Sequence, residues 1–207
     1  MRRLLSGLLA LVAPLRCAGC DEAIDVPAVF CDPCATLAEL ANSPGAVFDY
    51  GGPVADAIQR FKYGGRSELG PVLGSVMAAK AQRWSGEVDA VVPVPLHWRR
   101  RRSRGYDQAA LLATPVAKSL GVPALVRGLQ RVRNTPSQVD LPHTERQQNI
   151  AGAFAARRLG QSKRVLLVDD VQTTGATLRE ASRALRMAGV AEVRTLVLAA
   201  RLLRQAT

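Results

Sequence analysis

This chain of 207 residues has few aromatic residues and far fewer acidic than basic ones. Aromatics make up 4% of the sequence, so the core must be built from aliphatic side chains. Hydrophobic residues make up 48%, which excludes an intrinsically disordered chain. The 17 Asp and Glu face 28 Lys and Arg, a formal net charge of +11. Such an excess favours partners that carry phosphate: nucleotides, nucleic acids or anionic lipids.

Apolar runs of membrane-spanning length are also missing, since a spanning helix needs about 20 apolar residues. The longest candidate, Leu4–Leu15, follows two arginines and resembles the start of a secretory signal, but no A-x-A cleavage pattern comes after it. We interpret Arg2–Ala13 as an amphipathic helix that packs on the body of the protein or on a partner. We therefore expect a cytoplasmic protein without a transmembrane segment, and leave open peripheral contact with the inner face of the membrane.

Cysteine is confined to the first 34 residues, in two matched pairs: Cys17-x-x-Cys20 and Cys31-x-x-Cys34. Two such pairs are typical of a tetrahedral zinc site. Two disulfides or unpaired thiols are the alternatives, and a reducing cytosol disfavours the disulfides. Four cysteine ligands leave no open coordination position, so the predicted zinc is structural and supplies folding energy to a segment too small to fold by core burial.

The turn-rich segment Asn42–Gly45 is the predicted domain boundary. Residues 1–44 are then an N-terminal helix and a four-cysteine zinc module, and residues 45–207 form a second domain. In that domain we predict helices from Pro53 to near Tyr63, over 67–84, over 106–120 with a disturbance at Pro115, and over 176–188. Predicted strands cover 46–50, 89–94, 122–126, 164–168 and 193–199. This alternation predicts an α/β domain with a mostly parallel sheet flanked by helices.

The most informative segment is Val165–Thr177, in which an aliphatic strand ends in Asp169 and Asp170 and a loop with three threonines and Gly175 leads into a helix. Ligands of parallel sheets bind at the carboxyl ends of strands, and a helix N-terminus binds phosphate. Adjacent acids suit the paired hydroxyls of a ribose, or waters around Mg²⁺. Walker A and G-x-G-x-x-G motifs are absent. A plain threonine N-cap explains one threonine, but not the whole segment.

This segment resembles the phosphoribosyl pyrophosphate (PRPP) signature of type I phosphoribosyltransferases. The resemblance implies that PRPP binds with Mg²⁺, that Asp169 and Asp170 contact the ribose hydroxyls, and that Thr173–Thr177 hold the 5′-phosphate. The whole PRPP-binding set that it implies comprises Asp169, Asp170, Val171, Gln172, Thr173, Thr174, Gly175, Ala176 and Thr177, together with Pro93, Val94 and Pro95 of the loop that follows an earlier strand.

Further motifs resemble the ComF/GntX group of competence-associated proteins. They comprise Val92–Leu96 with Arg100 and Arg104–Gln108, then Arg133, Gln138, Arg146, Asn149 and Ala153-Phe154, and the double Cys-x-x-Cys. Tyr106 and Asp107 stand where Phe and Asn are commoner in that group, which leaves the role of Asp107 open. The resemblance implies a role in bringing single-stranded DNA into the cytosol during natural transformation, beside a helicase-like partner.

Five arginines lie within six positions, at Arg99–Arg102 and Arg104. The resemblance implies that Arg100 and Arg104 meet the pyrophosphate. The other three suit either a nucleic-acid backbone or a solvated loop. Trp98, beside them, could stack a base or simply pack. The polar segment Ser137–Gln148, with Gln138, His143 and Arg146, is a predicted flap that closes over the substrate.

Two classes of function follow. The first is a phosphoribosyltransferase in which Asp169, Asp170, Arg100 and Arg104 act on PRPP and an unidentified acceptor, with no covalent nucleophile. The second is a non-catalytic adaptor of DNA uptake that binds PRPP or nucleic acid. Plain nucleobase salvage is a third interpretation.

Overall fold

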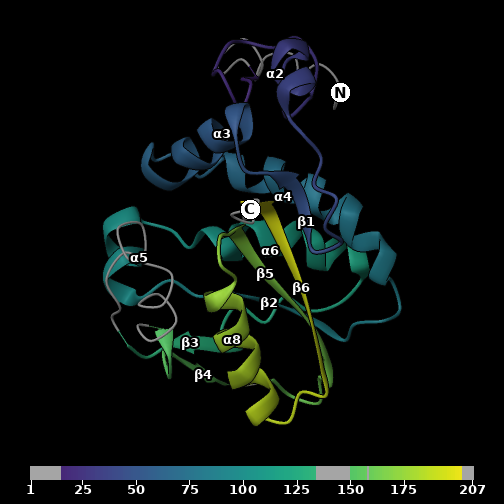
Figure 1. Ribbon diagram of the computed structural model, residues 1–207, viewed down its shortest axis with the longest axis vertical. Coiled ribbons are helices and arrows are strands. Elements are labelled where there is room, and N and C mark those ends of the chain that lie inside the picture. Colours follow the sequence, from purple (N-terminus) through teal and green to yellow (C-terminus); the bar gives the residue numbers. More distant parts are fainter. Residues whose placement is uncertain (1–14, 134–149, 158, 202–207) are drawn as a thin grey trace, which may run out of the picture.

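A computed structural model describes residues 15–133, 150–157 and 159–201 of the chain (Figure 1). The predicted helix Arg2–Ala13 and the predicted flap Ser137–Gln148 lie outside the described residues. The elements, in chain order, are α2 (Asp32–Leu37), β1 (Ala46–Asp49), α3 (Gly52–Tyr63), α4 (Leu69–Ala81) with the 3-10 turn η1 (Gln82–Trp84), β2 (Ala90–Pro93), α5 (Trp98–Arg104), α6 (Gln108–Leu120), β3 (Leu129–Arg131), β4 (Phe154–Ala156), β5 (Arg164–Gln172), α8 (Ala176–Met187) and β6 (Glu192–Ala200).

The central sheet has the strand order β1-β6-β5-β2, and all three pairings are parallel. This confirms the predicted α/β domain. In the ladder Pro93 lies opposite Val168, and Gln172 lies opposite Ala200. The carboxyl ends of β2, β5 and β6 therefore meet at one edge of the sheet, where parallel sheets bind their ligands.

The pleat of β5 sends alternate side chains into two separate cores. Leu166 and Val168 pack with α3, α4 and α6 on one face, and Val165 and Leu167 pack with α8 and the β3–β4 hairpin on the other. Figure 1 shows α8 in front of the sheet and α4 and α6 behind it. Both cores are largely aliphatic, as the shortage of aromatic residues predicts.

Helices α4 and α6 pack closely because two glycines of α4 face α6. A Cβ atom on Gly70 would lie 2.6 Å from the Cβ of Leu111, and one on Gly74 would lie 2.8 Å from the Cγ of Pro115. Helix α6 runs through Pro115, so the predicted disturbance there does not interrupt the helix. The ring of Pro115 instead fills the gap that Gly74 leaves.

We expect Gly74→Ala to lower the free energy of unfolding by about 1–3 kcal/mol. The new methyl group would meet Pro115 and, at 2.9 Å, the carbonyl oxygen of Leu112, which belongs to the backbone and cannot turn away. This cost exceeds the gain in helix propensity of about 1 kcal/mol. Urea unfolding measures it, with Ser75→Ala on the exposed side of the same helix as the control. A Gly74→Ala variant as stable as the wild type would contradict this close packing of α4 on α6.

Several predicted boundaries differ from those observed. The strand predicted over 164–168 continues as β5 to Gln172, because β6 pairs with it to that point. The strand predicted over 122–126 shrinks to a single bridge between Ala124 and Val91. The turn after Gly121 and the turn at 126–127 leave it no length. Helix α5 and the β3–β4 hairpin were not predicted, because the arginine-rich sequence of α5 and the two three-residue strands carry no clear periodicity.

The N-terminal residues continue into the main sheet. Leu40 forms an antiparallel bridge with Phe48, so residues 39–41 run along the outer edge of β1. Cys17, Ala18, Phe30 and Cys34 belong to the same buried cluster as α3 and α4. Among the described residues, none of the helices has both the length and the apolar character that crossing a bilayer requires.

Candidate functional site

The two acids of the predicted PRPP motif lie within the last part of β5, not after it. Asp170 is buried and forms an ion pair with Lys62 of α3, with 2.8 Å between Nζ and Oδ1. Asp169 accepts a hydrogen bond of 2.8 Å from the backbone N–H of Asp170. The pleat of β5 explains the split: Asp170 follows Leu166 and Val168 toward the face that α3 covers. Lys62 was missed from sequence, since nothing near it in the chain marks it as a partner of β5.

The charge of Asp170 affects the pKa values of the titratable groups around it. Burial, followed by the charge of Asp170, raises the pKa of Asp169 to about 8. Burial also raises the pKa of Asp107, which lies close enough to interact with Asp170. Burial lowers the pKa of Lys62, but the charge and hydrogen bond of Asp170 together with the charge of Asp169 act against it, and the net direction is upward. The site thus keeps one buried ion pair beside a second acid that resists ionisation, as buried titratable groups at functional sites often do.

The loop after β5 encloses a small cavity. Its volume is about 60 Å³, and it is lined by Val171, Gln172, Thr173, Gly175, Ala176, Thr177 and Leu178. Helix α8 begins here, so its free N–H groups face this space. Gly175 has a φ of 74°, a left-handed conformation that glycine adopts without strain. This arrangement suits one phosphate group.

Thr174 has a different role from its neighbours. It is buried, and its hydroxyl accepts a hydrogen bond from the N–H of Ala176 at 3.4 Å. Its carbonyl oxygen accepts one from Arg179 at 2.8 Å. Thr174 therefore shapes the turn just before α8, whose N-cap residue is Gly175, whereas Thr173 and Thr177 line the cavity.

The second predicted segment, Pro93–Pro95, lies beside the acids. Pro93 ends β2, and the N–H of Val94 donates to the carbonyl oxygen of Val168, the residue before Asp169, at 2.8 Å. The loop that follows is tied to α6 by Asp107, which accepts hydrogen bonds from the N–H groups of Leu96 and Ala110, both at 3.3 Å. Asp107 is thus the N-cap of α6, a role that sequence reasoning left open.

The five arginines do not form one surface, because residues 98–104 are helical. Arg104 lies over the ring of Tyr63 at 4.8 Å, and Arg99 lies over Trp98 at 5.3 Å. Arg100 is near the half-buried Arg131, and the two repel each other: partial burial, followed by the charge of Arg100, lowers the pKa of Arg131 to about 10. Of the predicted pair, Arg104 contacts α3 through Tyr63.

A larger cavity of about 380 Å³ lies between α5 and the β3–β4 hairpin. Arg101, Arg127, Arg131 and Arg157 line it together with Trp98, and Asp107 is the acid among its lining residues. Trp98 is exposed. Arg127, Arg131 and Arg157 lie outside the arginine run, and no sequence motif links them to it. The cavity suits a ligand that carries phosphate.

The four cysteines come together as their spacing predicts. Their sulfur atoms all lie within 4.8 Å of one another, and none is in a disulfide. Tetrahedral zinc with Zn–S bonds of about 2.3 Å needs sulfurs about 3.8 Å apart, and Cys20 and Cys31 are 3.6 Å apart. Burial raises the pKa of Cys17, but backbone hydrogen bonds from Cys20 and Cys31 lower it to about 6. The cluster could therefore hold a metal ion such as zinc.

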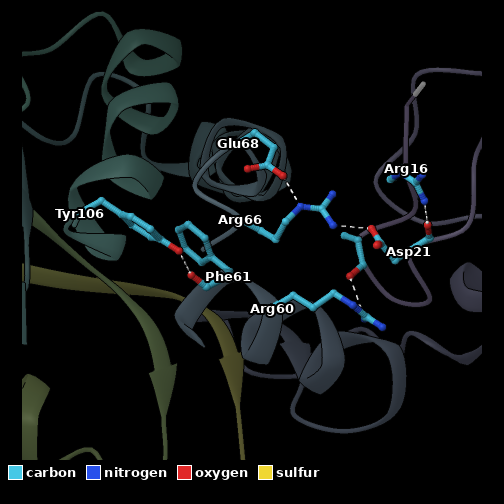
Figure 2. Close-up of polar contacts among 8 residues, drawn as sticks. Arg16, Asp21, Arg60, Phe61, Arg66, Glu68 and Tyr106 are labelled. Atoms are coloured by element: carbon cyan, nitrogen blue, oxygen red, sulfur yellow. Dashed lines mark hydrogen bonds and ion pairs between the residues drawn. The ribbon is translucent and has the colours of Figure 1, made fainter. Parts of the chain in front are cut away.

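Helix α3 connects this cluster to the acids of β5. Figure 2 shows Arg66, just after α3, reaching Asp21 beside the first cysteine pair, with 2.5 Å between Nη1 and Oδ1. Arg60 donates to the carbonyl oxygen of Ala18 at 3.5 Å. At the other side of α3, Tyr106 stacks on Phe61, with ring centroids 5.8 Å apart, and its hydroxyl donates to the Phe61 carbonyl oxygen (Figure 2).

Comparisons with known proteins agree with this geometry. Residues 107–206 match the phosphoribosyl transferase domain. Competence protein F of Haemophilus influenzae is 33% identical over 185 residues, covering 86% of this chain and 81% of the relative. The DNA utilization protein YhgH of Salmonella typhi is 31% identical, with 86% and 80% covered. Competence protein ComFC of Bacillus subtilis is 29% identical, with 73% and 61% covered. The chain therefore belongs to the ComF family of proteins with a type I phosphoribosyltransferase fold.

Proposed function

We propose that this protein binds PRPP with Mg²⁺ and transfers its phosphoribosyl group to an acceptor that is not yet identified. The observation that supports this best is the meeting of three parts at one sheet edge. These are the phosphate-sized cavity of residues 171–178, the acids Asp169 and Asp170, and the loop after β2. The 5′-phosphate would occupy the cavity, and the two acids would accept hydrogen bonds from the ribose hydroxyls.

In the proposed reaction the bond from the ribose C1 to pyrophosphate breaks as a lone pair of the acceptor bonds to C1. Asp169 and Asp170 would hold the ribose, and Arg100 and Arg104 would neutralise the departing pyrophosphate. Bound Mg²⁺ would supply further positive charge to the phosphate oxygens. Positioning and charge stabilisation are sufficient for such a step, since an oxocarbenium-like transition state needs no covalent nucleophile.

Zinc is the metal that we propose for the cluster of Cys17, Cys20, Cys31 and Cys34. Four cysteine sulfur atoms within 4.8 Å of one another match the donor set of structural zinc sites. The names of the relatives point to a biological role, in which the protein supports uptake or use of DNA. Transfer of a phosphoribosyl group and a role in natural transformation are compatible.

Calorimetric titration of PRPP with Mg²⁺ into the zinc-loaded, reduced protein tests the proposal. We expect saturable binding that weakens when ribose 5-phosphate replaces PRPP, because the pyrophosphate contacts are then lost. A flat titration would overturn it. Binding would justify a screen of acceptors, in which turnover with adenine, hypoxanthine, uracil or orotate would indicate nucleobase salvage.

The basic cavity beside α5 favours a second candidate function, binding of single-stranded DNA within an adaptor that also contacts a helicase-like competence protein. Four arginines and an exposed tryptophan combine backbone charges with a surface for base stacking. Arg101 and Arg127 are exposed there and far apart in sequence.

We expect Arg101→Ala with Arg127→Ala to weaken binding of a short oligothymidine by about 10-fold at low salt. Losing two phosphate contacts should also make the slope of log K against log salt shallower by about 1.4. Fluorescence anisotropy across a salt series measures both, with Arg183→Ala on α8 as the control. An unchanged slope would rule out this cavity as the DNA site.

A further inference from the structure

We propose that Lys62 is a positioning residue of the ribose site: it holds the Asp170 carboxylate where it can accept hydrogen bonds from a ribose ligand. The proposal rests on the proposed function of the site. The sequence motifs and the comparisons give Lys62 no role. It comes from α3, an element that carries none of the residues that the PRPP motif implies.

The ion pair between Lys62 and Asp170 is close and largely shielded from water. Nζ lies 2.8 Å from Oδ1, and the two side chains are 19% and 12% exposed. A pair in such surroundings is not a surface salt bridge, whose partners would be free to separate. Removing one partner of a buried pair leaves an uncompensated charge, and this is costly.

The charges around Asp170 make Lys62 its main counterion. Asp169 on β5 and Asp107 at the start of α6 are both acidic and both interact with it. On the opposite side of the site, Arg131 interacts with Asp169. Without Lys62, Asp170 would face two other carboxyl groups and would lack the cation that contacts it here. Its carboxylate would then turn away from the neighbouring carboxyl groups, and this removes an acceptor for a ribose hydroxyl.

The backbone of Lys62 is held in place by its neighbours. Phe61, before it, stacks on Tyr106, and Tyr63, after it, lies under the guanidinium of Arg104. Just before Phe61, Arg60 donates a hydrogen bond to the Ala18 carbonyl oxygen in the cysteine module (Figure 2). Three residues of α3 before and after Lys62 therefore contact two other parts of the chain, the segment 104–106 and the cysteine module. These contacts fix the backbone from which the Lys62 side chain reaches Asp170.

The position of Lys62 predicts a specific pattern of ligand dependence. The phosphate cavity is built from residues 171–178 and does not include Lys62 or Asp170. Loss of Lys62 should therefore weaken ligands that present ribose hydroxyls and leave inorganic phosphate unaffected. A purely structural role would weaken both, because the fold supports the whole site.

NMR titrations of PRPP with Mg²⁺, ribose 5-phosphate and inorganic phosphate test this in the full-length, zinc-loaded protein. For Lys62→Met we expect a loss of about 10- to 100-fold for the two ribose ligands, the effect of a charge-assisted hydrogen bond, and less than about 2-fold for phosphate. Lys62→Arg should restore most of the affinity. Lys118→Met, on the exposed side of α6, is the matched control.

A binding cycle with Asp170→Asn separates this role from a general effect on folding. If Lys62 acts through Asp170, adding Lys62→Met to Asp170→Asn produces no further loss of affinity, and the double variant contains no lone buried charge. Additive losses, or an equal loss for phosphate, would overturn the proposal while leaving the proposed function standing. A wild type that binds none of the three ligands would overturn the proposed function, and the role of Lys62 would fall with it.

Discussion

Replacing Asp169 and Asp170 together by Asn is expected to weaken binding of PRPP with Mg²⁺ by about 100-fold or more. Asp170 would lose a charge-assisted hydrogen bond to ribose, worth roughly 1.5–3 kcal/mol, and Asp169, whose raised pKa keeps it largely neutral, would lose a bond worth roughly 0.5–1.5 kcal/mol. Asn is nearly isosteric, so the strand and its ladder to β6 should persist. Isothermal calorimetry measures the loss, and inorganic phosphate serves as the reference ligand because its cavity lies in the following loop.

The single variants should differ in stability. The raised pKa of Asp169, about 8, means that the folded protein holds a proton which the unfolded chain releases above its ordinary value of 3.8. Stability is therefore lost as pH rises from about 4 to about 8, and Asp169→Asn should be more stable than the wild type at pH 8. Asp170→Asn should be less stable, because Lys62 would be left buried without its partner.

Thermal unfolding at pH 8 measures these two effects. A wild type that is more stable than Asp169→Asn would show that the buried Asp169 carboxyl does not lower the stability of the folded protein at pH 8.

The double variant also separates the two classes of function in cells. Complementation of Haemophilus influenzae that lacks Competence protein F would show this: if transformation survives the loss of PRPP binding, the protein acts in uptake as an adaptor rather than as an enzyme.

Removal of the metal should have the second large effect. We expect about one zinc per chain, and we expect Cys31→Ser with Cys34→Ser to lower the melting temperature by about 10 °C or more. The cluster lies against the main core: Cys17 and Cys34 are buried with Phe30, Phe48 and Val54. Losing about 4 kcal/mol of metal-dependent folding energy shifts a domain of this size by about 8–16 °C.

Elemental analysis and differential scanning calorimetry measure these outcomes, with and without a chelator. Zinc added back to the chelated wild type should restore its melting temperature, which serves as the control. Arg60 and Arg66 connect the cysteine module to α3, which also carries Lys62. We therefore expect loss of the metal to lower the affinity for PRPP as well. Metal-free protein that melts at the same temperature, or thiols found paired as disulfides, would exclude a structural zinc site.

Two parts of this protein could be predicted from the sequence because each is encoded in a short, continuous segment. The aliphatic run of β5 predicts a buried strand wherever it occurs, and a glycine and threonines before a helix predict an anion site at its first turn. Each Cys-x-x-Cys turn brings its own two sulfur atoms close together, so the fold has only to bring the two turns into contact. These are local hydrogen-bonding and burial preferences, which do not depend on the rest of the fold.

Long-range packing determines which residues from distant parts of the chain contact those segments. Lys62 reaches Asp170 only because α3 packs on the face of the sheet to which the pleat of β5 directs that side chain. The arginine run divides because seven residues coil into α5 and turn its side chains in different directions. In the sequence, Asp107 is a residue that departs from the usual pattern of its motif. In the structure it is the N-cap of α6, because α6 begins beside the loop after β2. Long-range packing fixes these neighbours, and no local pattern of residue types records them.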